Sequence, residues 1–372
     1  MKFAIFTHVQ HGYFAQQYFA YAPYVREMNV WAKFVDEIII VAPLVQSEPT
    51  KIDLFYESSN INVKSIPLIN FTSLIQAVRS LLMFPRIIYQ IVNAMAEADH
   101  IHLRCPGNIG LLACIVQIFF PKKFKTAKYA GNWDPKAKQP MSYRLQKWIL
   151  NNTFLTKNMQ IMVYGEWEGS SPNVKPFFTA SYWEADKIPI EPRNLVGKIN
   201  FVFAGTLSEG KRPLYAVEIV ERLQQEGVNV ALDIFGDGKE RATLEEYILD
   251  KNLESTIKLH GNQDEHVLRM AYQQAHFMIL PSKSEGWPKV VAEAMFWGCV
   301  PVSSAVSCVP FMLDYGERGL LLQMSLNEDV QKIMSLLADH EQYRRKAVAG
   351  ILWSRKYTMD FFQQEIKRLI HG

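Results

Sequence analysis

The sequence predicts an α/β protein built from two doubly wound domains. Three observations carry this prediction: the chain has 372 residues, short continuous apolar runs alternate with helical patterns, and the alternation stops and restarts around residues 184–198. A chain of this length is longer than a domain with a single hydrophobic core usually is. Continuous apolar strands are typical of parallel sheets that helices cover on both faces.

The first half alternates strand and helix patterns from its first residues onward. The predicted elements are, in order, a strand at 3–6, a polar loop at 8–12, strands at 37–42 and 61–66, a helix at 71–95 interrupted at Pro85, a strand at 98–103, a buried helix at 109–120 and a turn-rich loop at 131–135.

Residues 184–198 contain two prolines, a glycine and mixed charge, which predicts a linker. The alternation then restarts, with strands at 200–204, 230–235, 257–259, 277–280, 300–303 and 320–322, and helices at 214–226, 241–250, 265–274, 288–297, 329–339 and 341–371. We therefore expect a first domain at 1–185, a linker at 186–198, a second domain at 199–352 and a C-terminal helix at 353–372. Two such domains in tandem would place a cleft between the carboxyl ends of their sheets, where open α/β sheets bind ligands.

Composition excludes several classes of protein. With 49% apolar and 21% charged residues and no low-complexity tract, the chain is neither disordered nor fibrous. A net charge of +3 is too even for a dedicated nucleic-acid binder, so no nucleic-acid partner is expected. Four cysteines without CxxC spacing indicate buried, reduced thiols, and the longest apolar run has 12 residues, too few to span a bilayer. These features predict a cytoplasmic protein.

The charge is unevenly spread between the halves. Residues 1–187 carry 19 bases and 13 acids, whereas 188–372 carry 21 bases and 24 acids. Basic residues flank two apolar helices of the first half: Arg79, Arg86, Lys122, Lys123, Lys125 and Lys128. Such faces are typical either of a peripheral contact with the inner face of a membrane or of a buried helix followed by a solvated lysine loop.

Two glutamates mark a strand–loop–helix segment of the second half. Glu285 lies in the loop after a predicted strand, and Glu293 lies eight residues on, inside the next helix. A loop carboxylate can meet sugar hydroxyls, and the start of a helix favours an anion such as a diphosphate. The alternative is a pair of glutamates that only support the helix. The sequence contains no metal-binding motif, so no metal is expected.

The segment EGWPKVVAEAM, followed by WGCVPVSS, resembles the E-x7-E motif of the retaining glycosyltransferases of family 4. Three other segments agree with that family in order: Phe203–Leu207 with Lys211, Ile234–Gly238, and Leu259–Gly261. Together they cover roughly 200–325. The resemblance implies the GT-B fold, in which two Rossmann-like domains face a central cleft and a C-terminal helix crosses back to the first domain.

The resemblance also implies roles for individual residues. Lys211 would neutralise the donor diphosphate, and Gly205 would let the backbone approach it. Glu293 would bind the donor ribose, Glu285 would contact the transferred sugar, and Gly286 would let the chain pass close to that sugar.

Other positions complete the donor side. His260 and Gly261 would border the nucleobase, although His260 is equally well interpreted as a satisfied histidine at a strand end. Thr206 stands where the family commonly has arginine, and Arg212 is a candidate for that missing charge. The remaining donor-side candidates are Gly236 and Val290. Ser307, Cys308 and Phe311 stand where the family usually has a glycine pair and a glutamate, which leaves the donor's identity open.

The first domain resembles the family more loosely and would bind the acceptor. Candidates there are His11, Gly12, His102, Asn132 and Trp133. Trp133 would stack on a sugar face or take part in ordinary hydrophobic packing. Arg104 stands where the family's D-x-x-H-x-H strand end has its second histidine. Because arginine does not lose its proton, anion binding is its expected role, and it completes the predicted catalytic set with Glu285 and Lys211.

The implied activity is transfer of a sugar, with retention and without a cofactor, from a nucleotide-diphosphate sugar to a glycan or lipid-linked acceptor in bacterial surface-polysaccharide synthesis. Alternatives are a GT-B nucleotide-sugar epimerase or an inactive donor-binding partner of another transferase. A pair of dinucleotide-binding domains is disfavoured because neither half has a complete G-x-G-x-x-G with its following acidic residue.

Overall fold

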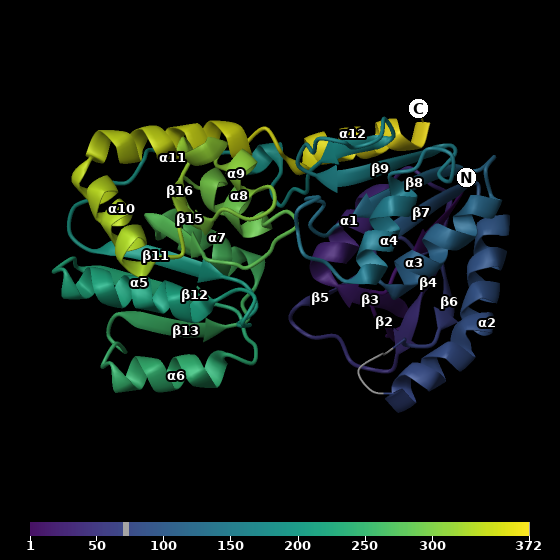
Figure 1. Ribbon diagram of the computed structural model, residues 1–372, viewed down its shortest axis with the longest axis horizontal. Helices are drawn as coiled ribbons and strands as arrows, with labels where there is room; N and C mark the ends of the chain where they lie inside the picture. Colours follow the sequence, from purple (N-terminus) through teal and green to yellow (C-terminus); the bar gives the residue numbers. More distant parts are fainter. Residues whose placement is uncertain (70–73, 372) are drawn as a thin grey trace. The chain divides into compact units, whose positions relative to one another are not determined.

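The computed structural model describes residues 1–69 and 74–371 (Figure 1). By its contacts the chain divides into two units, Met1–Phe178 with Gln363–Gly372, and Thr179–Phe362. Each unit contains its own sheet, which is mainly parallel in the first unit and entirely parallel in the second. The segment 186–198 belongs to the second unit, because the Arg193 guanidinium donates hydrogen bonds to the backbone carbonyls of Tyr272, Gln273, Trp297 and Gly298.

The sheet of the first unit has the strand order β10-β9-β8-β7-β1-β4-β2-β3-β5, with β6 also paired to β4. Its strands are β1 (Lys2–Phe6), β2 (His11–Phe14), β3 (Gln17–Tyr21), β4 (Glu37–Val45), β5 (Asp53–Phe55), β6 (Ile61–Ile66), β7 (His100–Cys105), β8 (Phe124–Tyr129), β9 (Met159–Tyr164) and β10 (Val174–Phe177). The helices are α1 (Ala22–Ala32), α2 (Leu74–Glu97), α3 (Asn108–Val116), the 3-10 turn η1 (Gln117–Phe119) and α4 (Met141–Leu150). The central strand β1 is buried from Phe3 to Phe6, as its continuous apolar run predicts.

Residues 8–12 differ from the predicted polar loop. His11 begins β2, which forms an antiparallel hairpin with β3. The turn consists of Ala15 and Gln16, both with positive φ (48° and 64°). Hairpin turns of this kind usually contain asparagine or glycine. The sequence therefore carried no turn signal here.

Two helices differ from their predicted extents. Helix α2 continues through Pro85 without a break. Because Pro85 is exposed, water can satisfy the carbonyl group that loses its intrahelical partner there. The predicted final helix is two helices, α11 (His340–Ser354) and α12 (Met359–His371), separated by a turn in which Thr358 is fully buried. The first residues predicted for the helix at 71–95 lie outside the described part of the chain.

The second unit has a six-stranded parallel sheet in the order β13-β12-β11-β14-β15-β16. Its strands are β11 (Ile199–Ala204), β12 (Val230–Phe235), β13 (Ile257–Gly261), β14 (Phe277–Leu280), β15 (Val300–Ser304) and β16 (Leu320–Leu322). Besides α11, its helical elements are η2 (Glu184–Asp186), α5 (Pro213–Gln225), α6 (Arg241–Asp250), α7 (Glu265–Gln274), α8 (Lys289–Phe296), α9 (Val309–Met312), η3 (Asp314–Gly316) and α10 (Leu326–Ala338). The order reverses between β11 and β14, the kind of position where open α/β sheets bind ligands.

Helix α12 belongs to both units, because its residues up to Phe362 group with the second unit and those from Gln363 group with the first. The Lys33 ammonium donates to the Gln363 side-chain oxygen at 3.3 Å, and the Phe34 ring lies edge-on to His371. The four cysteines are free and buried, as their sequence contexts predict.

Candidate functional site

Three loops meet at the carboxyl ends of β11, β12 and β13 in the second unit. The Gly205 N–H donates to the Phe235 carbonyl at 2.9 Å, and the Gly236 N–H donates to the Gly261 carbonyl at 2.8 Å. A Cβ on Gly236 would lie 1.9 Å from the Gly205 carbonyl oxygen, and φ at this residue is +135°. Only glycine fits there. The predicted donor-side glycines 205, 236 and 261 are therefore held together by backbone hydrogen bonds.

An ion pair lies beside these loops. The Lys211 ammonium, in the loop after β11, is 2.6 Å from a carboxylate oxygen of Glu285, in the loop after β14. The strands β11 and β14 are hydrogen-bonded neighbours, so the loops that follow them meet at the same edge of the sheet. The Glu285 side chain is 7% exposed and that of Lys211 is 28% exposed. The lysine head therefore still reaches solvent, where an incoming anion can compete for it.

The loop after β14 is fixed by its neighbours. The Lys283 N–H donates to the Gly210 carbonyl at 2.8 Å, and the Lys283 ammonium pairs with Glu209. From β15, the Ser304 hydroxyl donates to the Ser282 carbonyl at 2.5 Å. Two strand-end loops on neighbouring strands are thus tied by one backbone bond and two ion pairs.

The residues that depart from the family pattern support Gly286. The Cys308 thiol donates to the Gly286 carbonyl at 3.0 Å, and the Ser307 hydroxyl approaches the same oxygen at 3.4 Å. Burial raises the pKa of Cys308 to about 12, so the group stays a thiol and keeps its donor hydrogen. Phe311 lies edge-on to Trp353. Ser307 and Cys308 therefore fix the backbone directly after Glu285.

Helix α8 carries Val290 and Glu293, and both are partly exposed. The Glu293 carboxylate accepts a hydrogen bond from the Ser181 hydroxyl, in the segment that leads into the second unit. Burial and the Glu293 charge raise the pKa of the Tyr272 hydroxyl. Glu293 therefore has protein partners of its own, which its position in the E-x7-E spacing did not indicate.

Thr206 and Arg212 flank the Lys211 loop. Thr206 is exposed, and its carbonyl accepts the Ser208 N–H at 2.9 Å. Arg212 precedes α5 with left-handed backbone angles (φ 50°, ψ 51°). Among the described residues no side chain or backbone group forms a hydrogen bond or ion pair with its guanidinium. Its proposed role as the second positive charge of the site stays a prediction.

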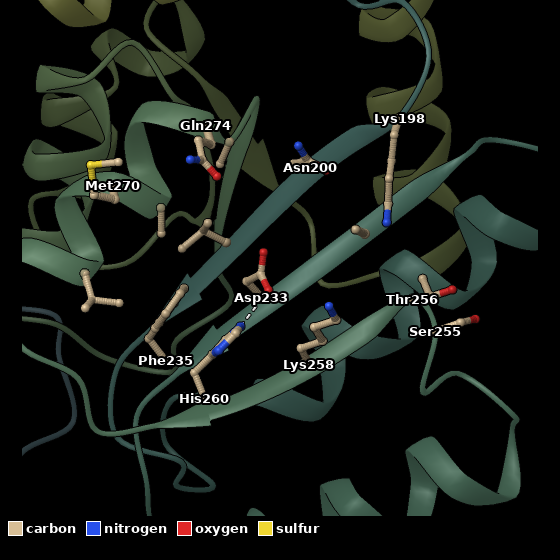
Figure 2. A pocket seen from close by; sticks show the side chains of 15 residues that line it. Lys198, Asn200, Asp233, Phe235, Ser255, Thr256, Lys258, His260, Met270 and Gln274 are labelled. Atoms are coloured by element: carbon tan, nitrogen blue, oxygen red, sulfur yellow. Dashed lines mark hydrogen bonds and ion pairs between the residues drawn. The ribbon is translucent and has the colours of Figure 1, made fainter.

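His260 points onto the face of the sheet and not into the loops. Its Nε2 is 2.6 Å from the Asp233 carboxylate, and its ring stacks on Phe235 at 4.6 Å between centroids (Figure 2). Lys198 and Lys258 line the same groove, whose volume is about 320 Å³. This arrangement matches the satisfied strand-end histidine that the sequence left as the alternative to a nucleobase contact.

Arg104 belongs to a buried ionic cluster of the first unit. Glu27, on α1, accepts hydrogen bonds from the Arg104 guanidinium and, at 3.0 Å, from the Lys128 ammonium. The guanidinium also lies 5.4 Å from the centre of the Tyr24 ring. Burial opposes ionisation of Glu27, but the two cations outweigh it and hold the pKa of that carboxyl well below its ordinary value. The Arg104 guanidinium is thus engaged within the protein, where it shares the single Glu27 charge with Lys128.

The two candidate histidines of the acceptor side are wrong, because both are fully buried. The His11 Nε2 is 2.7 Å from the Tyr56 hydroxyl, and the His102 Nδ1 is 2.8 Å from the Thr126 hydroxyl. Burial lowers the pKa of His11 to about 4 and that of His102 well below its ordinary value. Both are neutral core histidines, and neither reaches a surface where an acceptor could bind.

The other acceptor-side candidates also have structural roles. Trp133 is 3% exposed and packs edge-on against Tyr129, so the sugar-stacking prediction is wrong and ordinary packing is observed. Gly12 is buried in β2 opposite Phe19. The Asn132 side chain accepts the N–H two residues on, at 2.9 Å, and fixes a turn, although Asn132 itself stays partly exposed.

Two of the four lysines of the basic face predicted at 122–128 are buried, whereas Lys122 is exposed and Lys123 is partly exposed. Lys125 and Lys128 are 3% and 1% exposed. The Lys125 ammonium donates to the Phe120 carbonyl at 3.1 Å, and burial lowers its pKa to about 8. Lys123 donates to the carbonyls of Ala96 and Ala98 at the end of α2.

Sequence analysis missed Glu27, Ser181 and Lys283. Glu27 lies between the apolar Val25 and Met28 on the buried side of α1, and that position was the available signal. Ser181 lies in a stretch without periodicity, so nothing in the sequence pointed to it. Lys283 lies inside the recognised loop, but its partner Glu209 is 74 residues away.

The described residues contain neither a metal-binding group nor a membrane-spanning helix. Nowhere in 1–69 and 74–371 do three His, Cys, Asp or Glu side chains gather as a metal-binding group. The helices of the same residues include none that is long and apolar enough to cross a bilayer.

Part of the chain is similar to known glycosyltransferases. Residues 186–351 match the family model for glycosyl transferases group 1. The chain is 26% identical over 178 residues to the putative colanic acid biosynthesis glycosyltransferase WcaL of Salmonella typhimurium, covering 46% of this chain and 43% of WcaL. It is 27% identical over 190 residues to the amylovoran biosynthesis glycosyltransferase AmsK of Erwinia amylovora, covering 49% and 46%. The matches thus span less than half the length of these relatives.

Among solved structures, the whole chain resembles Anabaena Alr3699/HepE, determined in complex with UDP and glucose. The TM-score is 0.71 with 13% identity, over 100% of this chain and 99% of that one. At that identity the likeness concerns the fold. The chain has the GT-B fold of two Rossmann-like units, as the resemblance implied.

Proposed function

We propose that this chain is a retaining glycosyltransferase that binds a nucleotide-diphosphate sugar on its second unit. The observation that carries the proposal is the Lys211–Glu285 ion pair, 2.6 Å long, beside the loops joined through Gly205, Gly236 and Gly261. An ammonium that still reaches solvent beside glycine-lined loops suits a diphosphate, and a buried carboxylate suits sugar hydroxyls. The match to glycosyl transferases group 1 over the same residues supports it.

In this proposal the ion pair changes partner when the donor binds. The Lys211 ammonium turns to the diphosphate, where it stabilises the negative charge that develops as the bond to the sugar breaks. Glu285, released from the lysine, accepts hydrogen bonds from the transferred sugar. No carboxylate is assigned as a covalent nucleophile, so the donor phosphate deprotonates the acceptor on the same face of the sugar, and configuration is retained. No metal or cofactor takes part.

We infer further that the acceptor is a glycan or a lipid-linked glycan of a bacterial surface polysaccharide, bound at the first unit and reached from the cytoplasm. The support is the set of relatives, whose names assign WcaL to colanic acid and AmsK to amylovoran biosynthesis. The complex of HepE with UDP and glucose favours a UDP-sugar donor.

The test measures donor binding before transfer. Binding of UDP- and GDP-sugars, with chelator present, is followed by calorimetry for the wild type, Lys211→Met and Glu285→Gln, with Lys251→Met as an exposed lysine control in the same unit. Loss of a charge-assisted hydrogen bond predicts roughly 10- to 100-fold weaker binding in Lys211→Met. Glu285→Gln keeps most of the donor affinity and loses transfer, because its carboxylate acts on the sugar.

Four outcomes contradict the proposal. If no nucleotide sugar binds, the assignment of the donor site is wrong. If binding requires a divalent metal, the proposed mechanism is wrong. Donor isomerisation or hydrolysis without an acceptor points to an epimerase, and binding without turnover on any acceptor points to an inactive partner.

A further inference from the structure

Three helices cover one face of the first sheet. The chain passes from β6 through α2 to β7, through α3 to β8 and through α4 to β9, always in the same direction across the sheet. Right-handed crossovers in one direction place their helices on one face. The contacts of α3 with both α2 and α4 agree, and Figure 1 shows α3 and α4 adjacent.

The outward side of α4 is apolar. Met141, Leu145 and Trp148 are 83%, 41% and 60% exposed, at the i, i+4, i+7 spacing of one helix face. Leu150, on the opposite side, and Ile149, between the two sides, are buried against the sheet core. Helix α4 therefore has two apolar sides, although a helix on the surface of a soluble unit needs only one.

Apolar exposure continues on the neighbouring elements. The large, exposed apolar side chains of α2, α3, η1 and the loop after α4 are Leu82, Met83, Ile88, Tyr89, Val92, Ile115, Phe119 and Phe154. Exposed apolar side chains that gather on neighbouring elements are typical of contacts with proteins or membranes.

Charge decides between those two partners. Residues 135–165 contain five bases and no acid. Four of these bases are exposed and form no ion pair with a carboxylate in the described structure: Lys136, Lys138, Arg144 and Lys157. The fifth, Lys147, is partly buried and donates to the Asp134 carbonyl at 3.0 Å. An uncompensated positive rim around an apolar stripe complements an anionic lipid surface, where apolar side chains enter the acyl boundary and cations meet headgroups.

We propose that the outward face of α4, Met141–Trp148, with its flanking cations, docks on an anionic lipid bilayer. This surface differs from the one predicted at 122–128, where Lys125 and Lys128 are buried. Docking would bring the chain to a lipid-linked acceptor, and this role of docking rests on the proposed function. Lipid binding itself requires neither donor nor acceptor.

Flotation of the full chain with vesicles tests the docking. Vesicles of phosphatidylcholine alone are compared with equimolar phosphatidylcholine and phosphatidylglycerol, at low and high salt. The wild type is expected to float with anionic vesicles only, and less at high salt. Lys136→Ala/Lys138→Ala is expected to weaken partitioning roughly 30-fold. Met141→Ser/Trp148→Ser is expected to bind weakly even at low salt.

The matched control is Leu249→Ser/Lys251→Ala, which removes an exposed apolar side chain and an exposed cation from the second unit. It is expected to float like the wild type. The proposal is overturned if the wild type does not bind anionic vesicles or if the α4 variants bind them equally well. It is also overturned if the chain self-associates without vesicles and Met141→Ser/Trp148→Ser abolishes that self-association, because the face is then a protein contact. Calorimetry with nucleotide sugar on the same preparations keeps a failure of docking separate from a failure of donor binding.

Discussion

Removal of the Glu27 carboxylate would leave two cations buried without a counter-charge. The side chains of Lys128 and Arg104 are 1% and 12% exposed, and both donate to Glu27. Breaking a buried ion pair by deleting one partner costs roughly 3–5 kcal/mol, because the remaining charge has lost both water and partner. We therefore expect Glu27→Ala to lower the free energy of unfolding of the first unit by about 3–5 kcal/mol, measured by urea denaturation.

Two controls separate the buried charge from other effects. Glu27→Leu/Arg104→Leu/Lys128→Met removes all three charges and is expected to cost less than Glu27→Ala alone. Glu365→Ala breaks the more exposed pair with Arg368 and is expected to cost less than about 1 kcal/mol. If Glu27→Ala lowers the free energy of unfolding by no more than Glu365→Ala does, the Glu27–Arg104–Lys128 cluster does not stabilise the fold. Arg104 would then again be a candidate for anion binding.

The same cluster predicts a direction of pH dependence. Because folding lowers the pKa of Glu27 below its ordinary 4.5, the stability from its ionisation is present above about pH 4.5 and is lost as the pH falls further. Glu27→Gln cannot lose that contribution. Its unfolding free energy is therefore expected to fall less steeply below pH 4.5 than that of the wild type, and parallel curves would contradict the assignment.

Three further predictions concern single residues. Gly236→Ala places a methyl group 1.9 Å from the Gly205 carbonyl oxygen, so we expect at least a tenfold loss of nucleotide-sugar affinity by calorimetry, and unchanged affinity would separate these loops from the donor site. Folding lowers the pKa of His11 from 6.5 to about 4, so the contribution of the neutral imidazole to stability is present above pH 6.5 and declines toward pH 4. A His11 imidazole signal that titrates near 6.5 by NMR would contradict the burial of this residue. Trp133→Ala is expected to cost about 3–5 kcal/mol in unfolding free energy with little change in acceptor KM, whereas a raised KM at intact stability would restore the stacking role.

Much of the second unit follows from the local sequence. Strand β12 and helices α6 and α7 have the predicted bounds, because each is a continuous apolar run or a helical pattern flanked by turn residues. The hairpin of β2 and β3 was missed because its turn contains Ala15 and Gln16 and no glycine. The break before α12 was missed because Thr358 becomes a boundary only through its buried contacts.

By itself, the sequence determined the α/β alternation, the GT-B fold and the loop residues that gather around Lys211 and Glu285. Their positions follow from chain order, since residues after neighbouring parallel strands meet at one edge of the sheet. Only the tertiary structure decided which polar side chains reach solvent. Lys128 is paired with Glu27, 101 residues away, while the exposed Lys136, Lys138, Arg144 and Lys157 have no carboxylate partner in the described structure. Burial and charge pairing depend on contacts between distant segments, and a local pattern contains no information about them.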